Sequence, residues 1–129
     1  MQTSKLLVLM LVCSFLSNIS HSQDITKDTI QAHKTVTIAD SLYQMAHYKD
    51  AEKSYKQAAL LFEKHKIWYY YISVINKQGN IHSQLGNKKE ALSTYMTALK
   101  KGLEEFEDTN PSVADIYHNI GQLYTELSN

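Results

Sequence analysis

The stretch LGNKKEALSTYMTALKK, residues 85–101, decides the fold. After a short turn at Gly86, small residues return at Ala91 and Ala98 with Tyr95 between them, which is the spacing of one helix face. Alanine buries less apolar surface than leucine, so its use on such a face needs a reason. Two helices joined by a short turn lie in close antiparallel contact, and small side chains let their backbones approach to about 8–10 Å. The stretch therefore predicts a helical hairpin in which Gly86 caps the preceding helix.

The same features occur forty residues earlier in MAHYKDAEKSYKQAALL, residues 45–61. The residues that coincide are Ala51 with Ala91, Tyr55 with Tyr95 and Ala58 with Ala98. The preceding helices repeat as well, because Gly79 aligns with Gly121 at an offset of 42, while a fainter copy places Ala39 at Gly79. A unit of this length predicts stacked helix pairs, each packed on its neighbours.

Periodicity and turn residues set the helix boundaries. DTNPS, residues 108–112, is the clearest break, because Asn110 precedes Pro111, and proline suits the first turn of a helix. We expect helices at 27–46, 48–64, 67–85, 88–107 and 111–127. On helix 88–107, the apolar face includes Leu99 and Leu103.

The last helix is expected to pack on the helix at 88–107. Its packing residues are Ile116, Ile120, Leu123 and Leu127. Tyr117 and Gly121 then form an uncovered apolar strip, which predicts weak self-association through this C-terminal helix.

These residues resemble the tetratricopeptide repeat (TPR), a helix–turn–helix unit that stacks into a right-handed solenoid. In the best copy the resemblance is carried by Gly79, Gly86, Ala91, Tyr95 and Ala98. NPSVADIYHNIGQLY, residues 110–124, resembles the 42-residue variety of kinesin light chains and bacterial signalling proteins. The resemblance implies an all-α fold of antiparallel helix pairs stacked as a short α-solenoid, with about two and a half repeats over residues 23–129.

In the family that the chain resembles, the first helix of each pair lines a concave surface that binds extended peptides. Amide side chains suit this task because each offers a donor and an acceptor to a peptide backbone. The alternative is an ordinary hydrophilic face. The residues expected to line the groove are Asp40, Tyr43, Asn76, Asn80, Ser83, Gln84, His118, Asn119 and Gln122.

The N-terminal segment has a different character. Lys5 precedes the apolar run LLVLMLVCSFL, residues 6–16, and small residues at Ser20 and Ser22 follow. Eleven apolar residues are fewer than the roughly 20 that a membrane helix needs. The pattern predicts a signal peptide at 1–22, cleaved before Gln23, and therefore an exported protein, periplasmic or secreted, with no stable membrane span after cleavage. The alternatives are an uncleaved anchor or a buried helix.

Composition and motifs narrow the function. All 13 basic residues are lysines, balanced by 13 acidic residues, so we expect no nucleic-acid partner. Histidine spacing suggests no metal site, and the pair Asp115 and His118 is interpreted as a solvated helix pair rather than a catalytic dyad. We expect no cofactor and no enzyme activity.

The sequence thus favours a non-catalytic scaffold that binds a protein or peptide. An alternative is the sensory or ligand-binding region of a longer signal-transduction protein, either a histidine kinase or a transcriptional regulator, of which this chain would be a fragment.

Overall fold

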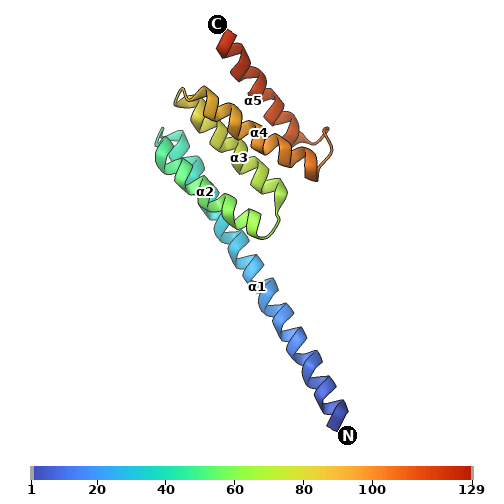
Figure 1. Cartoon of the computed structure of the whole chain (residues 1–129). Helices are drawn as coiled ribbons and strands as arrows, with labels where there is room; N and C mark the ends of the chain where they lie inside the picture. Colours follow the sequence, from blue (N-terminus) through green and yellow to red (C-terminus); the bar gives the residue numbers. More distant parts are fainter. Residues whose placement is uncertain (1, 129) are drawn as a thin grey trace.

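A computed structural model describes residues 2–128, and within that range the chain is helical without a strand (Figure 1). Two antiparallel pairs, α1 with α2 and α3 with α4, stack side by side, and α5 packs on α4 and α3. The predicted all-α solenoid of stacked helix pairs is confirmed. The helices are α1 (Gln2–Gln44), α2 (Tyr48–Lys64), α3 (Trp68–Gln84), α4 (Lys88–Glu105) and α5 (Pro111–Ser128).

The first helix begins much earlier than expected. The sequence predicts a helix at 27–46, but α1 starts at Gln2 and continues unbroken to Gln44. The reason is that neither proline nor glycine interrupts this stretch, so nothing stops the helix between the apolar run and the body. The apolar side chains of 6–16 are exposed along the rod that projects from the body (Figure 1). Met1 of the predicted signal peptide and Asn129 at the end of the predicted domain lie outside the described residues.

The turns that close the helices share one geometry. Gly86 has a φ of 75°, and Ala46 and Lys66 adopt nearly the same left-handed conformation at 59° and 55°. In each turn the next amide reaches back to the fifth residue before it, as in a Schellman motif. These bonds run from His47 N to Leu42 O at 2.9 Å, from Ile67 N to Phe62 O at 2.8 Å and from Asn87 N to His82 O at 2.9 Å. The predicted cap at Gly86 is confirmed.

The small residues lie where the helices cross. Ala51, Ala58, Ala91 and Ala98 are fully buried. Gly79 is also buried, and a Cβ atom added there would collide with the ring of Tyr95. Close helix contact therefore explains the alanines and the glycine.

Two expectations about apolar packing are wrong. Leu127 is 53% exposed, because the C-terminal end of α5 projects beyond α4 (Figure 1). Leu103 is exposed as well. Its neighbour Gly102 is buried instead, and a Cβ atom added there would lie 2.9 Å from the side chain of Val113 on α5. The absence of a side chain at residue 102 lets α5 approach α4, so the start of α5 covers this position.

Candidate functional site

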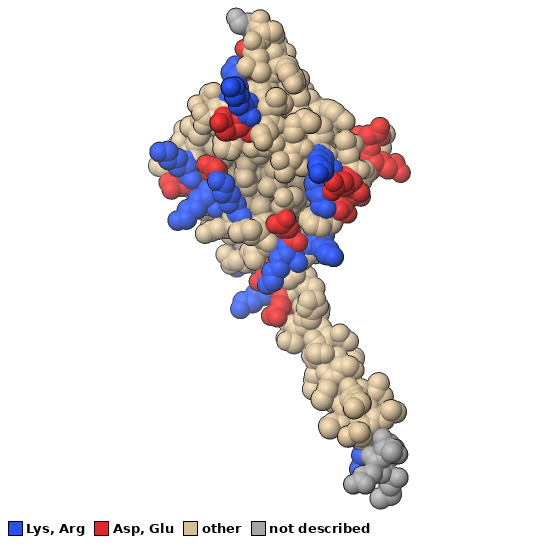
Figure 2. Space-filling view, viewed as in Figure 1, with Lys and Arg blue, Asp and Glu red and all other residues tan. Residues whose placement is uncertain are grey.

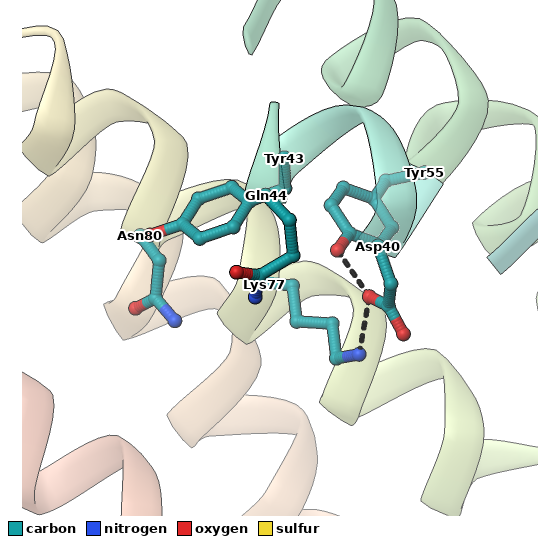
Figure 3. A pocket seen from close by; sticks show the side chains of 6 residues that line it. All are labelled: Asp40, Tyr43, Gln44, Tyr55, Lys77 and Asn80. Carbon is teal, nitrogen blue, oxygen red and sulfur yellow. Dashed lines mark hydrogen bonds and ion pairs between the residues drawn. The ribbon is translucent and has the colours of Figure 1, made fainter. Parts of the chain in front are cut away.

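One side of α1, α3 and α5 carries two adjoining hollows that share Tyr43 and Asn80. The first has a volume of about 300 Å³ and is lined by Asp40, Tyr43, Gln44, Tyr55, Lys77 and Asn80 (Figure 3). The second, of about 210 Å³, is lined by Tyr43, Asn80, Ser83, Gln84, Tyr95, Asn119, Gln122, Leu123 and Glu126. We call the two hollows together the groove.

The first hollow contains a paired charge. Asp40 Oδ1 accepts hydrogen bonds from the hydroxyl of Tyr55 and from Lys77 Nζ, the latter at 2.6 Å (Figure 3). Burial, and then the bond to Asp40, raise the pKa of Tyr55, so its phenol stays protonated and acts as a donor. Lys77 also lies near the Tyr55 ring, 5.7 Å from its centre. The charges of Asp40 and Lys77 therefore largely offset each other in the groove.

The second hollow is built from amides held by neighbouring helices. The hydroxyl of Tyr95 donates to Asn80 Oδ1 at 2.7 Å, and Asn119 Nδ2 donates to Asn76 Oδ1 at 2.9 Å. Burial raises the pKa of Tyr95 to about 12, so the phenol remains a donor at neutral pH. The first bond orients Asn80 from α4, and the second joins α5 to α3. The positions of the Asn80 and Asn119 amides are thus fixed by the fold.

The structure brings most of the residues expected for the groove together. Asn76 lies beside the hollows as the partner of Asn119. His118 is exposed and lines neither hollow, because one residue along a helix turns the side chain by about 100° away from Asn119. The residues that do line the hollows are Asp40, Tyr43, Asn80, Ser83, Gln84, Asn119 and Gln122.

Several residues of the groove were not predicted from the sequence. The rings of Tyr55 and Tyr95 are buried beside the small residues, and their hydroxyls also reach the groove. The signal was present in the sequence, since each tyrosine follows its acceptor by fifteen residues in both units. The other missed residues are Gln44, Lys77, Leu123 and Glu126.

Charges of both signs lie interspersed over the helical body, whereas most of the projecting N-terminal rod carries none (Figure 2). Glu126, at the edge of the second hollow, pairs with Lys88 Nζ at 3.3 Å. The charged side chains of the groove thus belong to ion pairs, while its middle is lined by amides and hydroxyls.

Repeated helix pairs with a polar groove along their first helices define the class of α-helical repeat proteins. Residues 72–100, which run from within α3 into α4, match the family model of the tetratricopeptide repeat. This part of the chain is therefore a tetratricopeptide repeat, as the resemblance implied. Comparison with curated proteins and with solved structures found no match. Tetratricopeptide repeats are typically non-catalytic scaffolds for protein interaction.

Proposed function

We propose that the chain is an exported scaffold that binds an extended peptide segment of a partner protein in the groove. The observation that carries this proposal is the continuity of the two hollows across α1, α3 and α5. An extended peptide has a free amide or carbonyl on each residue, and the side chains of Ser83, Gln84 and Gln122 offer both donors and acceptors to such groups.

The charge distribution supports a peptide with little net charge in its central residues. Asp40 and Lys77 already neutralise each other, so a charged ligand group would have to displace one of them. Tyr43, which lines both hollows, supplies a partly buried ring between them. Aromatic side chains of this kind are enriched where proteins bind one another.

The test begins with a peptide library displayed on phage and selected on the purified protein, followed by calorimetry on the selected peptides. Gln84→Ala and Gln122→Ala should each weaken binding by about five- to tenfold, because each removes a hydrogen bond worth about 1 kcal/mol. Gln57→Ala makes the same change on an exposed part of α2 and should leave binding unchanged. Peptides that bind all three variants equally would place the binding surface elsewhere.

Export is the second part of the proposal. Within the described residues one helix, counted from Lys5, is long and apolar enough to cross a membrane by length and composition, and a signal sequence near an N-terminus passes the same test. The positive Lys5 and the small residues Ser20 and Ser22 support the signal-peptide interpretation. Mass spectrometry of the protein from its native cells should find Gln23 at the N-terminus. A chain that still begins at Met1 would contradict cleavage.

The same groove could serve as the sensory region of a longer signalling protein. Immunoblotting of native cells with an antibody against the helical body separates the two cases. A band near the size of the chain, 14.8 kDa, or slightly smaller supports the free scaffold. A much larger band supports the signalling protein.

A further inference from the structure

The exposed side of α5 carries a strip in which small residues alternate with tyrosines. Its spacing of three and four residues is that of a helix-pairing seam. Tyr117 and Tyr124 are 48% and 56% exposed, and a Cβ atom added at Gly121 would find open space. The strip consists of Ala114, Tyr117, Gly121, Tyr124 and Ser128.

The same positions are pairing surfaces elsewhere in the chain. Forty-two residues earlier, the strip corresponds to the side of α3 on which α4 packs, where Gly79 lies under the ring of Tyr95. One unit further back it corresponds to the side of α1 that α2 covers, where Ala32 and Ala39 are fully buried. The strip on α5 therefore continues a row of surfaces that are each covered by an antiparallel helix.

We propose that this strip pairs with the same strip of a second copy of the chain. Two α5 helices placed antiparallel over their full length bring Tyr117 of one copy opposite Gly121 of the other, and Tyr124 opposite Ala114. Every tyrosine then meets a small residue, which is the packing of Tyr95 on Gly79. The two-fold axis makes all four contacts occur at once, as an isologous interface requires.

The electrostatics agree with a second copy as the partner. The strip contains no charged residue, so pairing two identical strips brings no like charges together at its centre. The antiparallel arrangement also sets the positive N-terminal end of each helix near the negative C-terminal end of the other. One helix per copy makes a small interface, so the dimer is expected to be weak and reversible.

The experiment is sedimentation of the protein as it accumulates in its native cells, over a wide range of concentration, with the N-terminus identified by mass spectrometry. Wild type should show a reversible monomer–dimer equilibrium. Gly121→Tyr should weaken dimerisation by about tenfold or more, because two tyrosines then face each other across the seam. Circular dichroism of Gly121→Tyr should show a helical monomer, since the site is open.

A compensating pair gives the proposal its sharpest test. Gly121→Tyr combined with Tyr117→Ala restores a small residue opposite each tyrosine and should recover dimerisation. Asp115→Gln, an exposed change outside the strip, should behave as wild type. The proposal is overturned by a native protein whose mass shows that the chain continues past Asn129 with a helix that covers the strip, or by a wild type that stays monomeric up to about 1 mM. It is also overturned by a Gly121→Tyr variant that dimerises like wild type, or by a double variant that fails to recover. Peptide binding in the groove enters none of these outcomes, so the two proposals can fail separately.

Discussion

The hydroxyl of Tyr95 donates a hydrogen bond to the side chain of Asn80 across the α3–α4 pair, 2.7 Å away. Tyr55 makes the equivalent bond to Asp40 across the α1–α2 pair. In both cases the ring packs beside a small residue of the first helix, Ala39 or Gly79, while the hydroxyl reaches the groove. One side chain in each unit thus joins the helix crossing to the groove.

Removing this hydroxyl should cost stability without opening a cavity. Tyr95→Phe deletes the bond to Asn80 and should lower the free energy of unfolding by about 1 kcal/mol, the usual net worth of a hydrogen bond. Urea unfolding of the purified protein measures the change. Tyr69→Phe, at an exposed position outside the strip on α5, is the control and should have little effect. Equal unfolding midpoints for both variants and wild type would show that the bond contributes nothing.

Stability should also fall at high pH. The pKa of Tyr95 is raised to about 12 by burial, whereas the pKa of an unfolded tyrosine is near 10.0. Because the folded pKa is the higher one, the contribution is complete below about pH 10 and is lost as the pH rises toward about 12. Midpoints of urea unfolding, measured from roughly pH 9 to roughly pH 12, test the effect. Tyr95→Phe should show a shallower decline than wild type.

Ala91 should not tolerate a large side chain. It is fully buried where α4 crosses α3, so Ala91→Leu should destabilise the protein by about 1–3 kcal/mol through overpacking. Lys89→Leu, two residues away and exposed, should change stability little. A stable Ala91→Leu variant would mean that the two helices are farther apart than in this structure.

The two aligned glycines should respond to alanine with opposite signs. Gly79→Ala pushes a methyl group into the ring of Tyr95 and should cost about 1–3 kcal/mol. In the dilute monomer Gly121→Ala meets open space and should stabilise α5 by about 0.5–1 kcal/mol, because alanine favours the helix over glycine. Thermal melts of both variants provide the comparison. A destabilised Gly121→Ala variant would indicate that something already covers this face.

The left-handed turn at Ala46 is a site for stabilisation. Its φ is 59°, a conformation that costs a non-glycine residue about 1–2 kcal/mol, and the equivalent Gly86 adopts it freely. Ala46→Gly should therefore raise the melting temperature, by about 4–8 °C for each 1 kcal/mol in a domain of this size. Gly86→Ala should lower it. If both variants melt like wild type, the turns carry no strain.

Much of the fold could be predicted from the sequence because its constraints are local. Short turns force helix contact, and contact requires small residues, so Ala51, Ala91 and Gly79 reveal the pairing directly. The boundaries of α2 to α5 follow from Pro111 and Gly86 and from apolar periodicity. Where no breaker residue occurs, as in α1, the sequence does not mark where a helix begins.

The groove was harder to predict for a different reason. Helix periodicity indicates which side a residue faces, and this was sufficient for Asn80 and Gln122. It does not indicate how far a long side chain reaches from a neighbouring position, and so Lys77 was missed. Nor does it resolve residues at the edge of a face, where His118 points outside and Asn119 points in.

Because the turns at Ala46 and Gly86 match, the forty residues from 47 to 86 form a segment that could be duplicated or removed as a unit. Its two ends meet the chain in the same left-handed conformation, and α2 and α4 bury the same faces, as Ala51, Tyr55 and Ala58 correspond to Ala91, Tyr95 and Ala98. A gene that duplicated or lost this segment would therefore lengthen or shorten the protein by one whole helix pair while reusing interfaces that already exist. The length of the groove could then evolve in whole steps, without a new core for each length.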